Sequence, residues 1–139
     1  VLFRGVALRP GRPVSVATVE GTPVCALPGK PVAAHTAAVL VLRSLFAGER
    51  RLPTLTADLD VRVTVPEGDP EFAVPVTLAD GTATPLGHAA SSLPLYDERF
   101  APGRVASSTR VTLADGVVLT DGALDAGEPV SVVPYEVVE

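Results

Sequence analysis

A stiff turn with a single lysine is the part of this sequence best suited to chemistry. It reads Leu27-Pro28-Gly29-Lys30-Pro31, follows a short apolar segment and precedes a long apolar run. The prolines fix φ and lack N–H groups, and Pro31 suits the first position of a helix. Gly29 is expected to let the turn reach backbone angles that other residues avoid and to let a ligand come close to the backbone. Unpaired N–H groups at a helix start, with Lys30 beside them, predict an anion site. An ordinary strand-to-helix corner with a solvated lysine is the alternative, and local chemistry taken alone favours it.

Two arginines form a second candidate site. Arg9 and Arg12 flank Pro10-Gly11, so both guanidinium groups can lie on one tight turn. Arginine is suited to bidentate contact with phosphate. Both this turn and the turn at residues 27–31 adjoin strands that are close in sequence. If the two turns lie at the same edge of one sheet, they would form a two-sided anion cradle.

No pair of a nucleophile and a base stands out elsewhere in the sequence. His35 lies within the apolar run, where a hydrogen-bonded core histidine is the favoured interpretation over a ligand. His88 lies in an expected loop, and neither histidine is near Cys25 in sequence. We therefore expect no metal site built from histidine and cysteine.

Two charged segments allow more than one interpretation. Glu67, Asp69 and Glu71 alternate with a glycine and a proline and could hold a cation, although a solvated loop is the simpler prediction. Residues 96–100 are charged with an aromatic residue at each end. They suit either a contact with a partner or a lid over the barrel.

Composition sets limits on the class of protein. The chain has 139 residues, of which 47% are hydrophobic and 19% are charged, so we expect one ordinary folded domain or two small ones. The net charge of −5 argues against general binding to nucleic acid or to an anionic membrane surface. The apolar run at residues 32–47 is too short to span a bilayer. We expect a cytoplasmic protein, because no signal-peptide pattern is present and Cys25 has no internal partner. The chain does not begin with Met, so we expect a fragment or a processed chain.

Residues 1–50 are predicted to fold as β-β-β-α. Strands are expected at residues 2–8, 14–19 and 24–27, with proline and glycine marking the turns between them. The helix is expected at residues 32–46, ending at Gly48. Its apolar positions cover almost the whole circumference, which indicates burial between layers.

The segment after a boundary at residues 48–53 is predicted to be all-β. Alternation of apolar and polar residues indicates strands at residues 59–65 and 72–78, with Pro75 suggesting an edge strand or a bulge. Further strands are expected at residues 110–113, 117–119 and 130–135. Asp80-Gly81 and Asp115-Gly116 are turn signals, and residues 87–103 are expected to be irregular. Short strands at this spacing favour a small barrel or sandwich.

Two motifs, taken in order, resemble those of a known family. V-A-L-R-P-G-R-P at residues 6–13 and L-P-G-K-P at residues 27–31 precede an alanine-rich helix. Together they resemble the molybdopterin molybdenumtransferases, the family of MoeA and the E domain of gephyrin. The closing residues 116–119 and 124–132 are also similar to the family pattern. Lys30 stands where the family usually has asparagine, and residues 101–103 fall at its glycine-serine-glycine turn.

The resemblance implies a layout and a site. Residues 1–50 would be an α/β fragment, the end of the molybdopterin-binding domain, and residues 53–139 the small all-β barrel domain at the C-terminus. The family inserts molybdate into adenylylated molybdopterin and releases AMP, with a divalent cation such as Mg²⁺, and acts as a cytoplasmic homodimer. The implied molybdopterin-binding residues are Arg9, Gly11, Arg12, Pro28, Gly29, Lys30 and Pro31.

The rest of the family's site has no counterpart in this chain. Its acidic metal-binding positions and glycine-rich phosphate turn belong to the other two-thirds of the family's length, so we expect the isolated chain to be inactive. A non-catalytic binding or scaffold module is the alternative, in which the loop at residues 91–103 docks a peptide or a partner subunit. A degenerate paralogue is a third hypothesis, suggested by Lys30 and Pro102.

Overall fold

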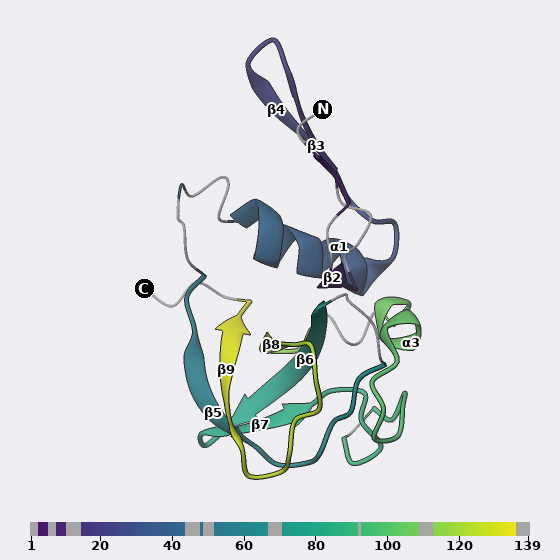
Figure 1. The fold of residues 1–139 in the computed structure, drawn as a ribbon, viewed down its shortest axis with the longest axis vertical. Coiled ribbons are helices and arrows are strands. Elements are labelled where there is room, and N and C mark those ends of the chain that lie inside the picture. Colours follow the sequence, from purple (N-terminus) through teal and green to yellow (C-terminus); the bar gives the residue numbers. More distant parts are fainter. Residues whose placement is uncertain are drawn as a thin grey trace.

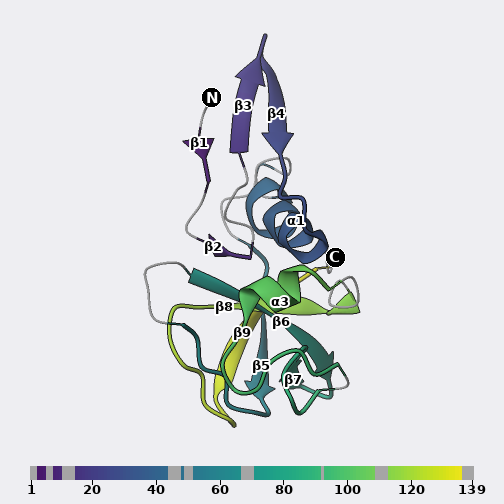
Figure 2. The same ribbon diagram turned by 90° about the vertical axis from the view of Figure 1, so that its right-hand side faces the viewer.

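The computed structural model describes residues 3–5, 8–10, 15–43, 48, 52–66, 71–91, 93–108 and 113–135. A closed barrel carries a helix on one side, and a β-hairpin projects beyond the helix (Figures 1 and 2). In chain order the elements are β1 (Phe3–Arg4), β2 (Leu8–Arg9), β3 (Ser15–Val19), β4 (Thr22–Ala26), α1 (Pro31–Ala37), the π-helical turn η1 (Ala38–Leu42), β5 (Leu55–Leu59), β6 (Glu71–Ala79), β7 (Thr82–Pro85), α3 (Pro102–Ala106), β8 (Gly116–Thr120) and β9 (Pro129–Pro134).

Five strands close into a small mixed barrel. Their order is β6-β7-β5-β9-β8, and pairing of β6 with β8 completes the circle. The β5–β7 pair is parallel, whereas the other barrel pairs are antiparallel. The side chains of Val76 and Val132 are fully buried inside. Of the two predicted architectures, barrel and sandwich, the structure has the barrel.

The first Asp-Gly turn is confirmed. Asp80 and Gly81 connect β6 to β7 with φ of +50° and +77°, the left-handed angles that a two-residue hairpin of this type requires. The strand before it was predicted within one residue at each end. However, β6 has neighbours along both sides, so the prediction of an edge strand from Pro75 is wrong. Pro75 lies one residue beyond the last β6–β7 pair, Val76 with Pro85.

The second Asp-Gly is not a turn. Gly116 is the first residue of β8 and pairs with Val76 on one side and Pro134 on the other. A Cβ on Gly116 would lie 2.5 Å from the carbonyl oxygen of Val133. Glycine is therefore needed here for close packing of backbones. The strand predicted before it, at residues 110–113, lies mostly outside the described residues.

Two other predictions in the barrel are wrong. The predicted strand at residues 59–65 begins where β5 ends, at Leu59. Its alternation marked the buried Leu59 and Val63, but the chain bends between them, and Val63 forms only an isolated bridge with Leu124. The barrel segment also holds a helix, α3, which begins at the end of the predicted irregular region and extends beyond it. Pro102 starts this helix instead of breaking structure, because the first helical position needs no N–H.

The predicted order β-β-β-α largely holds in the first segment. β1, β3 and β4 form an antiparallel sheet, but the first predicted strand is two short strands separated near Gly5, which has φ of +78°. The second of them, β2, pairs with β6 of the barrel instead. The predicted helix runs through α1 and η1, and residues 44–47 lie outside the described part. Within the described ranges no helix is long and apolar enough to cross a membrane.

The helix and the barrel share buried clusters. Val39 of η1 packs in one cluster with Leu8, Ala73 and Val117, and Val32 of α1 packs in another with Phe72. Burial of such side chains stabilises by roughly 1.5–3 kcal/mol each. Helix α1 is therefore held on the barrel by apolar contact. The boundary between residues 1–50 and 53–139 stays a prediction.

Candidate functional site

The β3–β4 hairpin brings the ends of the two predicted turns together. Ser15, the first residue of β3, pairs with Ala26, the last residue of β4. The basic turn precedes Ser15 by a few residues, and the turn at residues 27–31 directly follows Ala26. Both turns are thus attached to the same end of this hairpin. Arg9 itself lies in β2, which pairs with β6 of the barrel sheet, and residues 11–14 lie outside the described part, so the anion cradle at one edge of one sheet stays a prediction.

The turn at residues 27–31 has the predicted strand-turn-helix form. Lys30 is the cap residue of α1, with extended φ and ψ of −79° and 140°, and Pro31 is the first helical residue. The carbonyl of Lys30 accepts a hydrogen bond of 2.9 Å from the N–H of Ala34. Pro28 is buried and anchors the turn, whereas Gly29 and Lys30 are exposed. The rigid part of the turn therefore presents its lysine to solvent.

Gly29 contributes open space to this turn. It is not among the glycines with positive φ, so the prediction that it gives the turn angles which other residues avoid is wrong. A Cβ built on it meets nothing within 4 Å. The space beside the Gly29 backbone is therefore open, and ligand binding there stays a prediction.

Arg9 lies on the same side of the barrel. It pairs with Phe72 of β6, and Phe72 shares a buried cluster with Val32, two residues beyond Lys30. Both views place β2 and α1 on the same side of the barrel. Arg9 is exposed, and across the described ranges neither Arg9 nor Lys30 forms an ion pair. Gly11 and Arg12 lie outside the described residues.

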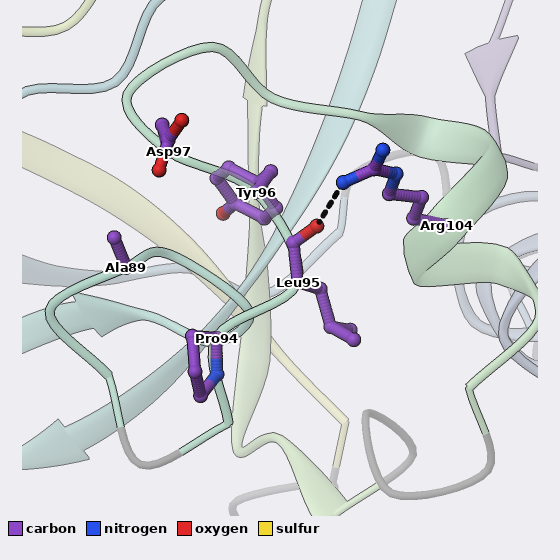
Figure 3. A pocket seen from close by; sticks show the side chains of 6 residues that line it. All are labelled: Ala89, Pro94, Leu95, Tyr96, Asp97 and Arg104. Atoms are coloured by element: carbon purple, nitrogen blue, oxygen red, sulfur yellow. Dashed lines mark hydrogen bonds between the residues drawn. The ribbon is translucent and has the colours of Figure 1, made fainter.

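A separate hollow of about 210 Å³ lies beside α3 (Figure 3). Its lining is Ala89, Pro94, Leu95, Tyr96, Asp97 and Arg104. The Nη1 of Arg104 donates a 3.2 Å hydrogen bond to the carbonyl of Leu95, on the opposite side of the Tyr96 ring from Asp97. The hollow therefore has a positive end and a negative end. Sequence reasoning missed Arg104, whose only signal was a basic residue after a proline and a glycine.

The segment at residues 96–100 serves as a lid on the core. Tyr96 and Phe100 pack edge to face at 5.4 Å inside the largest buried cluster, and burial raises the pKa of the Tyr96 hydroxyl. The charged residues between them stay exposed, and Glu98 pairs with Arg62. The aromatic ends therefore pack on the core as the lid interpretation expects, and the exposed charged residues leave the partner interpretation open.

Both histidines contact other parts of the fold. The ring of His35 is half-buried against Tyr135, and burial lowers the pKa of His35. The Nδ1 of His88 accepts a hydrogen bond from the N–H of Ala90. Because Nδ1 is then the acceptor, Nε2 carries the ring proton and donates a hydrogen bond to the carbonyl of Arg62. No group of three His, Cys, Asp or Glu side chains suited to a metal occurs among the described residues. Of the acidic cluster only Glu71 is described, and it starts β6.

The chain is similar in structure to MoeA proteins. It superposes on the crystal structure of the molybdopterin biosynthesis MoeA protein of Pyrococcus horikoshii with a TM-score of 0.70 and 26% identity, over 97% of this chain and 32% of that one. A second P. horikoshii OT3 structure gives 0.68 and 18%, over 96% and 32%. A molybdenum cofactor biosynthesis protein of Pyrococcus furiosus gives 0.70 and 22%, over 96% and 45%.

These matches cover nearly all of this chain but only part of theirs. The chain spans about a third of the length of the P. horikoshii proteins. No protein-family model matches the sequence, and no curated protein matches it. The barrel and the helix-hairpin segment together therefore have the fold of part of a MoeA protein.

Proposed function

We propose that this chain is the C-terminal part of a MoeA-like molybdopterin molybdenumtransferase and supplies one wall of a site for adenylylated molybdopterin. The observation that most supports this proposal is the match to a MoeA structure along 97% of the chain. In this chain, the two basic turns are attached to the same end of the β3–β4 hairpin. The order of the two sequence motifs supports the same proposal. The wall comprises the turn at residues 27–31 and the turn that contains Arg9 and Arg12.

Phosphate binding is the role proposed for the cations of this wall. Adenylylated molybdopterin carries phosphate groups, for which arginine offers paired donors and lysine a point charge. Arg9 and Lys30 are exposed, so binding breaks no ion pair between described residues. Pro28 and Pro31 keep the turn stiff, which reduces the entropy lost on binding.

Molybdate insertion and AMP release are proposed for a longer protein that contains this part. The chain spans about a third of the MoeA proteins that it matches. The described residues do not fit the divalent cation of the reaction, since they offer no suitable group of three ligands. We therefore propose that the isolated chain binds its ligand without catalysing the transfer.

Calorimetric titration with AMP and with molybdopterin tests this proposal. We expect both to bind the intact chain, and binding to weaken at least tenfold when Arg9 and Arg12 are replaced by alanine. Arg99→Ala is the matched control, because Arg99 is exposed on the lid segment and outside the proposed wall. Equal weakening by the control, or no binding by the unaltered chain, would contradict the proposal.

A binding or scaffold module is the second candidate function. The hollow beside α3 favours it, because Arg104 and Asp97 place opposite charges around a buried aromatic ring. Such a hollow suits a short peptide segment with both kinds of charge. This function predicts no binding of AMP or molybdopterin, together with a peptide affinity that Arg104→Ala removes.

A further inference from the structure

An exposed leucine lies in the same turn as the lysine of the candidate anion site. Leu27 is 47% exposed, although leucine is among the residue types most often buried. It directly follows β4, and Lys30, also exposed, directly precedes α1. Figures 1 and 2 show this connection between β4 and α1 at the base of the projecting hairpin. The turn therefore offers solvent an apolar side chain as well as a positive charge.

The backbone on both sides of this leucine is fixed. Pro28, directly after Leu27, is buried, and both Pro28 and Pro31 restrict φ. The carbonyl of Lys30 accepts a 2.9 Å hydrogen bond from the N–H of Ala34, which anchors the far end of the turn to α1. The near end belongs to β4, which pairs with β3. Little backbone freedom is therefore lost when a ligand covers the turn.

The middle of the turn leaves room for a ligand. Gly29 is exposed, and a Cβ built on it meets nothing within 4 Å. A ligand that covers the turn from Leu27 to Lys30 would meet an apolar side chain, bare backbone and an ammonium group. Free phosphate would use only the charged end, whereas a phosphate ester with a flat apolar ring would use both ends.

The exposure of Leu27 has meaning only together with its neighbours. Single exposed apolar side chains are common on protein surfaces and do not by themselves mark a site. Leu55 and Leu113 are also exposed, at 38% and 78%, and both lie outside this turn. Leu27 differs from them because it shares a stiff turn with an exposed cation of the candidate site.

We propose that Leu27 is the ring-binding residue of this site. The site then prefers a phosphate ester that carries a planar heterocycle over a bare sugar phosphate. This inference rests on the proposed function and names the residue that selects the organic part of the ligand. The ring packs on the Leu27 side chain while the ammonium of Lys30 pairs with the phosphate. Adenine and pterin are both planar heterocycles, so the test includes a ligand of each kind.

Calorimetric titration of the intact chain with AMP, molybdopterin and ribose 5-phosphate measures this preference. Covering part of a leucine side chain predicts that AMP or molybdopterin binds about fivefold more tightly than ribose 5-phosphate. Leu27→Ala should abolish the preference and leave the affinity for ribose 5-phosphate unchanged. Leu113→Ala, which shortens an exposed leucine outside the turn, is the matched control and should keep the preference. The unfolding temperature of each variant establishes that it is folded.

The methyl resonances of Leu27 provide a second, direct readout. A heterocycle stacked on the side chain shifts its methyl proton resonances upfield in the NMR spectrum. Ribose 5-phosphate has no aromatic ring and should leave them in place. An upfield shift with AMP assigns the adenine ring to Leu27, and a shift with molybdopterin assigns the pterin.

Three results would overturn the inference. They are equal affinities of the unaltered chain for all three ligands, equal weakening of all three by Leu27→Ala, and loss of the preference in Leu113→Ala. The second result would mean that Leu27 only shapes the turn. In each of these results the chain still binds phosphate, so the proposed function stands. Absence of binding by every ligand would contradict the proposed function together with this inference.

Discussion

The ring of His35 stacks on the ring of Tyr135, with centroids 4.2 Å apart and planes inclined by 30°. The contact joins helix α1 to the end of β9. Arg43, two turns further along the helical stretch, donates hydrogen bonds to the carbonyls of Pro134 and Tyr135, 3.0 and 3.3 Å away. The segment that carries the candidate anion site is thus fixed to the last strand of the barrel by polar as well as apolar contacts.

Loss of the Tyr135 hydroxyl should change stability little. Thr36 is its polar neighbour, but both hydroxyls are buried without a hydrogen bond of normal geometry, and burial raises the pKa of Tyr135 more than Thr36 lowers it. Removing a buried, poorly paired hydroxyl removes a desolvation penalty. We expect Tyr135→Phe to alter the free energy of unfolding by less than about 1 kcal/mol. Urea denaturation measures this.

The contrasting variant is Tyr135→Ala, which also removes the ring. It should lower stability by about 3 kcal/mol, because the ring packs against two of the buried clusters. If Tyr135→Phe is as destabilising as Tyr135→Ala, the hydroxyl forms a hydrogen bond that matters.

Acid should destabilise the protein through His35. Burial lowers its pKa below the ordinary 6.5, so the unfolded chain takes up a proton more readily than the folded one. The contribution of neutral His35 is fully present above pH 6.5 and is lost as pH falls from there toward the lower folded pKa. We expect the unfolding temperature to fall between pH 7.5 and 5 by less in His35→Gln than in the unaltered chain. His88→Gln is the control and should leave this part of the pH dependence in place.

Local backbone chemistry explains which turns could be predicted from sequence. Asp80-Gly81 was predictable because a two-residue hairpin demands positive φ from its own residues. The same dipeptide at Asp115-Gly116 has another role, set by Val133 packing from a distant strand. The alternating pattern at residues 59–65 reported burial correctly but not hydrogen bonding. Where a chain bends, a residue can be buried without being hydrogen-bonded as part of a strand.

The candidate site also combines features that local sequence predicts with features that depend on tertiary contacts. The stiff turn with Pro28 and Pro31 follows from the properties of its own residues, and its geometry matches the prediction. The hollow with Arg104 forms only when the loop before α3 folds against that helix, so no local pattern could show it. The pairing of Ser15 with Ala26 lies between these cases, since it needed only a short hairpin.

Gly116→Ala should destabilise the barrel strongly. The new Cβ would meet the carbonyl oxygen of Val133 at 2.5 Å and a methyl of Val132 at 2.8 Å. Two paired strands must then separate, and overpacking of this kind costs about 3 kcal/mol. Gly122→Ala is the control, because its Cβ meets nothing within 4 Å and its φ is not positive. Thermal unfolding of both variants measures the difference, and equal stability would show that β8 and β9 can shift apart.

Gly29→Ala separates the folding role of the turn from its proposed binding role. Gly29 has no positive φ and an added Cβ meets nothing within 4 Å, so alanine fits the folded chain. Because alanine has fewer unfolded conformations, we expect stability to stay equal or to rise by about 0.5 kcal/mol. The proposed ligand, however, would lie against the backbone between Gly29 and Lys30, where an added methyl intrudes. Calorimetry should therefore show weaker binding of AMP or molybdopterin in a variant that is no less stable. Unchanged affinity would place the ligand away from Gly29, and reduced stability would show that the open space is needed for folding.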